Sequence, residues 1–328
     1  MAVDQIDWRA TDAKIQECGS KGKSKQRDCF NFIVAVLPVN ESCLYACGTY
    51  AYSPTCTYID TRTFLLRTAV DGQPLTEDGK GRVPFDPALR FTAAMVEGAL
   101  YSGTSGNFLG TQHVISRSLG HQVPLKTETS LSWLQDPSFV ASTFVPEQDG
   151  DKVYFFFTET RSRSEFPQRM RVTLVARVCK DDVGGERVLQ KRWTTFLKAQ
   201  MLCYLPEDKF PLTVLQDMYV TKDEDGTIMH GVFTSQWFHG SSHSSAVCAF
   251  TLADIQAVFE GKYKMLNREL QVWVHVHRRH PGAPARSVSH GPSAGLHSQP
   301  GQGTLPHGRR GPSPRPPAPT HRPGGTTT

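Results

Sequence analysis

The sequence predicts an all-β fold in which a unit of several short strands is repeated along the chain. Apolar runs rich in β-branched and aromatic residues alternate with turn-forming clusters, as in a β-sheet protein. Four of these runs resemble one another and centre on aromatic residues at intervals of 56, 53 and 79 residues: Tyr45, Tyr101, Tyr154 and Phe233. A period of about 50 residues is the spacing of β-propeller blades. A long array of β-sandwiches would also fit three such intervals.

The individual elements are expected in the following order. Strands are predicted at 30–37, 43–47, 153–158 and 229–237, and a second apolar strand follows each central run, at 55–60, 109–117, 174–182 and 245–255. Asp-Gly steps within 147–151 and 223–227 predict hairpin turns, whose acidic residues lack calcium-loop spacing and are expected to be solvated. One helix is expected within 253–262, because Ile255, Val258 and Phe259 share a face and Gly261 is a stop signal.

Composition divides the chain into a body and a tail. Residues 271–328 contain seven arginines and no Asp, Glu or Lys, which leaves 29 basic and 31 acidic residues in the body. The basic character therefore belongs to the tail, and the body offers no argument for nucleic-acid binding. Residues 281–328 contain eleven Pro and nine Gly, too little apolar surface to offset the entropy of ordering. We expect a folded body at 1–273 and a disordered Pro/Arg/Gly/His-rich tail at 274–328.

Indications of cellular compartment point in two directions. No apolar stretch approaches the roughly 18 residues of a membrane-spanning helix, and the charged start at 1–20 lacks a signal-peptide pattern. These features predict that the chain as written stays inside the cell. In contrast, eight cysteines without a zinc-binding pattern indicate disulfides formed in an oxidising compartment. Asn40, followed by Glu41 and Ser42, is a glycosylation sequon.

No pattern indicates catalysis or a cofactor. The chain has no nucleophile elbow, no phosphate-binding glycine loop and no zinc-protease helix. Asp181 and Asp182 are adjacent and would point to opposite faces of a strand, so turn residues are favoured over an acid–base pair. The sequence therefore predicts a protein that is not an enzyme, with no cofactor, metal, nucleic acid or small-molecule substrate.

Several long segments, in the same order, resemble one known family. The segments 47–60 (CGTYAYSPTCTYID), 175–203, 230–237 and 245–264 closely resemble the sema domain of vertebrate semaphorins, nearest to the transmembrane class 4 members. The resemblance covers about residues 1–273. It implies part of a seven-bladed β-propeller, roughly three to four blades, truncated at both ends relative to the family. It also implies an extracellular, non-catalytic ligand of plexin receptors, acting in axon guidance and cell migration and commonly as a homodimer.

A second interpretation remains open for the function. The missing signal pattern favours an intracellular or non-functional truncated isoform, in which the Pro/Arg-rich tail would mediate protein interaction. Its proline-rich run at 312–319 has the composition of a polyproline II ligand.

The resemblance also implies a disulfide pattern. Three pairs are carried over from the family: Cys18–Cys29, Cys47–Cys56 and Cys203–Cys248. The family partner of Cys179 lies in a later segment, and Cys43 is an additional cysteine. A bridge between these two is formally possible, but free thiols or mispairing are favoured.

One further segment is a candidate protein interface. Phe166 precedes Pro167 in a charged stretch, where a loop is expected. Isolated exposed aromatics are common, yet Phe166 could anchor an interface with Arg163, Arg169 and Arg171 as its polar rim. Of the two contacts considered, dimerisation is preferred over plexin binding.

Overall fold

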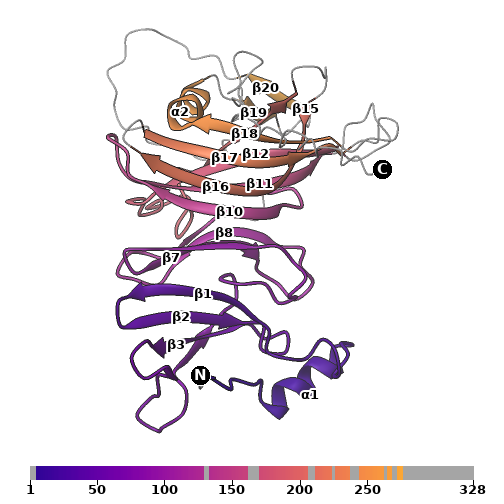
Figure 1. Ribbon diagram of the computed structural model, residues 1–328, viewed down its shortest axis with the longest axis vertical. Coiled ribbons are helices and arrows are strands. Elements are labelled where there is room, and N and C mark those ends of the chain that lie inside the picture. Colours follow the sequence, from indigo (N-terminus) through magenta and orange to yellow (C-terminus); the bar gives the residue numbers. More distant parts are fainter. Residues whose placement is uncertain are drawn as a thin grey trace, which may run out of the picture.

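The computed structural model describes residues 5–128, 133–161, 170–205, 211–223, 226–236, 244–261, 264–267 and 272–275. Within these ranges the chain forms antiparallel β-sheets and two short helices, α1 (Asp12–Ser20) and α2 (Leu252–Glu260). The larger sheets follow one another in chain order along the long axis of the molecule, from the N-terminal sheet beside α1 to the C-terminal sheet beneath α2 (Figure 1). The predicted all-β class is therefore confirmed.

The four larger sheets are numbered here from the N-terminus. The first contains β1 (Ile33–Asn40), β2 (Cys43–Gly48), β3 (Thr55–Asp60) and β4 (Leu65–Leu66), with β5 (Thr76–Asp78) also paired to β3. The second contains β6 (Thr92–Val96), β7 (Ala99–Ser105), β8 (His113–Ser118) and β9 (Leu125–Lys126). The third contains β10 (Ser138–Val145), β11 (Lys152–Arg161), β12 (Met170–Cys179) and β13 (Leu197–Gln200). The fourth contains β16 (Val214–Asp223), β17 (Gly226–Thr234) and β18 (Ser245–Thr251).

Two small hairpins complete the described strands. One pairs β14 (Cys203–Tyr204) with β15 (Pro211–Leu212), and the other pairs β19 (Lys264–Asn267) with β20 (Val272–His275). The last described strand thus ends two residues beyond the expected body boundary at 273. Residues 276–328, which make up nearly all of the expected tail, lie outside the described part of the chain.

The repeat predicted from aromatic spacing corresponds to the sheets. Tyr45, Tyr101, Tyr154 and Phe233 lie on β2, β7, β11 and β17, which are the second strands of the four sheets, and all four side chains are fully buried. The second apolar runs overlap the third strands β3, β8, β12 and β18, but the strand predicted at 245–255 is wrong for residues 252–255, which belong to α2. The longest interval, from Tyr154 to Phe233, contains the additional β14–β15 hairpin. One buried aromatic per sheet therefore marks each repeat unit.

The core lies between successive sheets. On β11, Phe155 and Phe157 pack toward the second sheet, in a cluster with Tyr101. The alternate residue Phe156 belongs to a different cluster, shared with Phe233 of the fourth sheet. Because both faces of β11 are buried, its sequence is a continuous apolar run rather than an alternation of apolar and polar residues.

The first strands of the four sheets lie next to one another. β6 contacts both β1 and β10, and β10 also contacts β16. The edge formed by the first strand of each sheet therefore lies against the neighbouring sheets, whereas strands such as β9 lie at the opposite, outer edge. Within the described residues the row of sheets is open, as in part of a propeller.

Local expectations were partly correct. The predicted helix is α2, capped by the Thr251 hydroxyl at its start and followed by Gly261. The turn at 147–151 joins β10 to β11 as predicted, but the Glu147 side chain is only 2% exposed because it pairs with Lys152. The expectation that the acidic residues of this turn are solvated is wrong for Glu147.

Candidate binding face

Strands of three successive sheets border a hollow of about 540 Å³, which we call the end hollow. It lies where β7 ends, where β10 begins, where β11 ends and β12 begins, and at the start of β16. Its polar lining consists of Arg90, Ser105, His113, Asp136, Ser138, Thr160, Arg171 and Gln216. The end hollow therefore collects polar side chains from positions far apart in the sequence.

A histidine and a carboxylate face each other in the end hollow. His113 Nε2 lies 3.9 Å from Asp136 Oδ1. Burial lowers the pKa of His113, although the nearby carboxylates Asp136 and Glu159 act in the opposite direction. His113 is therefore neutral at physiological pH, and the fixed charges of the lining are those of Arg90, Arg171 and Asp136. The lining carries a net positive charge.

One buried polar atom in the lining has no hydrogen-bond partner within the described residues. The hydroxyl oxygen of Ser105 is buried and forms no hydrogen bond there. Buried hydroxyls are normally satisfied. The wall of the end hollow therefore contains a buried hydroxyl whose hydrogen bonding is unsatisfied among the described residues.

A buried ion pair supports the wall of the end hollow. Lys198 Nζ lies 2.8 Å from both carboxylate oxygens of Glu159 and donates to the carbonyl oxygen of Trp133 at 2.7 Å. The Gln135 amide also donates to Glu159, at 3.1 Å. These bonds hold β11 and β13 to the segment that carries Asp136. They fix the position of the adjacent Thr160, which lines the hollow.

Of the four predicted interface residues, only Arg171 lies within the described ranges. Arg171 is part of the lining of the end hollow, and its amide donates to the Gln236 side chain at 2.5 Å. Phe166, Arg163 and Arg169 fall between β11 and β12, outside the described residues. Since β11 ends and β12 begins at the end hollow, the predicted segment is connected to this face.

The structure contains three disulfides, and they are the pairs implied by the family resemblance. Cys18–Cys29 joins α1 to the chain before β1, Cys47–Cys56 joins β2 to β3, and Cys203–Cys248 joins β14 to β18. Cys43 is a buried free thiol and Cys179 a half-buried one. Burial raises the pKa of the Cys179 thiol. The structure does not join these two cysteines to each other.

Comparison with known proteins finds a domain family and several relatives that are similar to this chain. Residues 215–300 match the Sema domain family. Human Semaphorin-4B is 51% identical over 279 residues, a match that covers 82% of this chain and 33% of that protein. Semaphorin-4A of Bos taurus is 47% identical over 298 residues, covering 89% of this chain and 38% of that protein. The chain is a homologue of the class 4 semaphorins.

Solved semaphorin structures share the fold. Drosophila Semaphorin 2a superposes with a TM-score of 0.70 at 32% identity, over 82% of this chain and 45% of that chain. The structure of Drosophila Plexin A in complex with Semaphorin 1b gives 0.69 at 31% identity, over 84% and 51%. These neighbours confirm that the open row of sheets is part of a sema-type β-propeller. The chain spans about a third of the length of the curated semaphorins that it matches.

The glycosylation sequon of this semaphorin homologue lies at a hairpin. Asn40 ends β1 and is exposed, and its side-chain oxygen accepts hydrogen bonds from the amide and hydroxyl of Ser42, both at 3.0 Å. The side-chain nitrogen, to which a glycan attaches, is on the exposed side chain. The site is sterically open to modification.

The two aspartates that were considered as an acid–base pair have different surroundings. Asp181 is exposed, whereas Asp182 is buried and accepts hydrogen bonds from the amides and hydroxyls of both Thr194 and Thr195. Asp182 therefore organises the chain before β13.

The polar lining of the end hollow was not predicted from the sequence, since Arg90, His113, Asp136 and Gln216 have no characteristic spacing. No helix among the described residues is long and apolar enough to cross a membrane.

Proposed function

We propose that this chain carries receptor-binding surface of a semaphorin-like extracellular signalling ligand, that its receptors are plexins, and that its role is not catalytic. The observation that carries the proposal is 51% identity to human Semaphorin-4B over most of the chain. A structurally similar semaphorin has been solved in complex with a plexin, at 31% identity to this chain. Guidance of axons and migrating cells is the corresponding proposed role.

The end hollow is the receptor contact that the geometry favours. It combines arginines, a neutral histidine and an unpartnered hydroxyl, and an interface needs such groups to fix register and orientation. Arginine is also among the residues enriched at binding hot spots. The net positive charge of the lining favours an acidic patch on the receptor.

Binding to a plexin ectodomain tests this proposal directly. Arg90→Glu and Arg171→Glu, combined, reverse the charge of the lining and should weaken binding at least tenfold in surface plasmon resonance, because the introduced glutamates would face the acidic patch of the receptor. Arg62→Glu and Arg67→Glu, combined, alter the net charge equally at exposed positions on either side of β4, and this control should bind as the parent chain does. Equal binding by the parent and the double variant would contradict the end hollow as the contact. Absence of binding by the parent chain would contradict the plexin proposal itself.

An extracellular location is proposed from the covalent features. Three disulfides are typical of proteins that fold in an oxidising compartment. Expressed behind a secretion signal, the chain should gain a glycan at Asn40, detected as a mass shift that glycosidase removes. Ser42→Ala should abolish the shift while leaving secretion intact. A secreted chain without the glycan would contradict this prediction.

Self-association is proposed for the segment between β11 and β12. In this proposal Phe166 is an interface anchor, with Arg163, Arg169 and Arg171 around it. Phe166→Ala should weaken dimerisation by about 1–3 kcal/mol in sedimentation velocity, with little change in the melting temperature. A melting temperature that falls by several degrees would instead indicate a core residue and reject the interface role.

A further inference from the structure

A second hollow lies at the outer edge of the second sheet, and its lining residues Gly106 and Gln112 are next in sequence to Ser105 and His113 of the end hollow. It has a volume of about 490 Å³, within the range of ligand-binding sites. Its charged lining is entirely basic: Lys80, Arg117, Lys126, Lys191 and Arg192. We call it the cationic hollow. The end hollow and the cationic hollow share no lining residue.

The charges of the cationic hollow are largely uncompensated. Lys80, Lys126 and Lys191 are exposed, and none of them is paired with a carboxylate among the described residues. Arg192 is the exception, since its Nε lies 3.1 Å from Glu128 Oε2. Three lysines therefore face solvent around one concave surface with their full charge.

Arg117 adds a buried positive charge beside the three lysines. Its side chain is 1% exposed and lies over the Trp193 ring, at 5.4 Å from the ring centroid. It donates to the carbonyl oxygens of Val123, Lys180 and Asp182. No carboxylate among the described residues contacts the guanidinium. A buried cation without a carboxylate partner raises the potential of the adjacent surface, because the low dielectric around it screens weakly.

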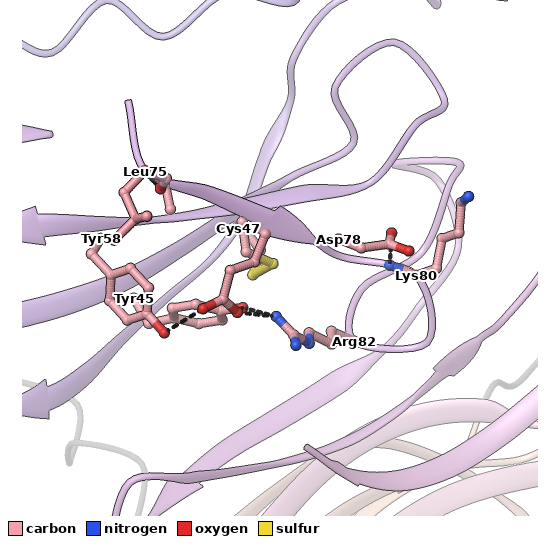
Figure 2. A network of polar contacts seen from close by, with 10 residues as sticks. Tyr45, Cys47, Tyr58, Leu75, Asp78, Lys80 and Arg82 are labelled. Carbon is pink, nitrogen blue, oxygen red and sulfur yellow. Dashed lines mark hydrogen bonds and ion pairs between the residues drawn. A yellow bond between two sulfur atoms is a disulfide. The ribbon is translucent and has the colours of Figure 1, made fainter. Parts of the chain in front are cut away.

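The backbone that carries the lysines is fixed in place. The Lys80 amide donates to Asp78 at 3.0 Å, and Arg82, two residues on, is held by Glu77 and by the Tyr45 hydroxyl. Figure 2 shows Arg82 turned into this network while the Lys80 side chain points away from it. Across the cationic hollow, the Lys126 amide donates to the Lys191 carbonyl at 3.3 Å, which keeps those two residues adjacent. The three lysines thus lie on segments from separate parts of the chain whose backbone is held by hydrogen bonds.

We propose that the cationic hollow binds the sulfate groups of a sulfated polysaccharide. Several separated point charges on an open concave surface suit a chain that presents repeated anions. The three disulfides indicate an oxidising compartment, where sulfated glycans rather than nucleic acids are the polyanions at hand. The site is separate from the proposed receptor contact, so either can fail without the other.

Lysine-specific footprinting tests the site in the intact chain. Acetylation followed by mass spectrometry is compared with and without a heparin dodecasaccharide. Residues 271–328 hold seven arginines but no lysine, so glycan bound to them does not enter the readout. Lys80, Lys126 and Lys191 should be protected at least threefold, whereas Lys14, Lys21 and Lys25, near or on α1, should not. Equal protection of both sets, or protection of neither, would overturn the proposal.

A charge-neutral triple variant measures the contribution of the site. Lys80→Gln, Lys126→Gln and Lys191→Gln together should weaken dodecasaccharide binding at least tenfold in calorimetry. Because fewer counterions are released, removing three cations should make the negative slope of log K against log salt shallower by about 2 to 3. The control is the same change at Lys14, Lys21 and Lys25, which alters the net charge equally and should leave affinity within twofold. Equal losses in both variants would show a non-specific charge effect and overturn the site.

The chemistry of the anion is tested with two further probes. The desulfated dodecasaccharide should neither bind nor protect the three lysines, because the sulfates supply the attraction. Inorganic phosphate at the same anion concentration should also fail to protect them. Protection by phosphate equal to that by the glycan would show a small-anion site and overturn the assignment to a sulfated polysaccharide.

Discussion

Glu159 and Lys198 form a deeply buried ion pair, with side chains 1% and 4% exposed. Lys198→Met should lower the free energy of unfolding by about 3–5 kcal/mol, because Glu159 would remain charged and buried without its partner. Adding Glu159→Gln should recover part of this loss, since the uncompensated charge is removed. Urea denaturation of both variants checks the prediction. Lys14→Met, at an exposed pair, is the control and should leave the midpoint nearly unchanged.

His113 should make stability depend on pH. Burial lowers its pKa in the folded state below the ordinary value of 6.5, so the unfolded chain binds a proton more readily. The contribution of His113 to the free energy of unfolding is therefore fully present above its ordinary pKa. It is lost as the pH falls through that value toward the pKa of the folded state. Between about pH 8 and pH 5, His113→Gln should flatten the fall in unfolding free energy, measured by denaturant titration. An unchanged slope would contradict the buried, neutral state of His113.

Residue-level roles were only partly predictable from sequence. A buried carboxylate such as Glu147 resembles a solvated turn residue, because its partners Lys152, Tyr154 and Gln256 are fixed by strand register and by a distant helix. The same holds for Asp182, whose bonds come from Thr194 and Thr195 across a loop. The local sequence pattern predicts that such residues lie in turns, whereas tertiary packing determines whether their side chains are buried.

At the scale of elements, the disulfides close loops of very different length. Cys203–Cys248 spans a sequence separation of 45, and Cys47–Cys56 spans 9. From loop-closure entropy, replacing both cysteines by alanine should cost about 4 kcal/mol for the long bridge and about 2.5 kcal/mol for the short one. Thermal unfolding of the two double variants checks this order. A larger loss at Cys47–Cys56 would show that strand pairing rather than loop entropy determines the effect.

The strands were predictable where burial leaves a strong pattern. The run at 153–158 was recognised because both faces of β11 are covered, so nearly every residue is apolar. α2 carried a capping threonine, an apolar face and a terminal glycine. In contrast, α1 buries only Cys18 and was not predicted, because its other residues carry no apolar periodicity. Both hollows also escaped prediction, since their residues meet only when separate sheets pack.

At the scale of the whole molecule, β11 connects two interfaces between sheets. Phe155 belongs to the cluster shared with the second sheet, and Phe156 to the cluster shared with the fourth. Phe155→Ala should therefore increase hydrogen exchange in β6 to β8, and Phe156→Ala in β16 to β18 and α2, each with a loss of about 3–5 kcal/mol. Exchange that rises equally in all sheets for both variants would contradict separate interfaces.

The end hollow draws its lining from the second, third and fourth sheets. A molecule bound there contacts its full set of partners only when all three sheets are folded and docked together. The free energy of binding therefore stabilises the arrangement in which all three sheets are docked, and it does not stabilise partly assembled arrangements. A receptor bound at this face would therefore suppress the local unfolding of single sheets. Without it, the sheets are stabilised mainly by contacts with their immediate neighbours.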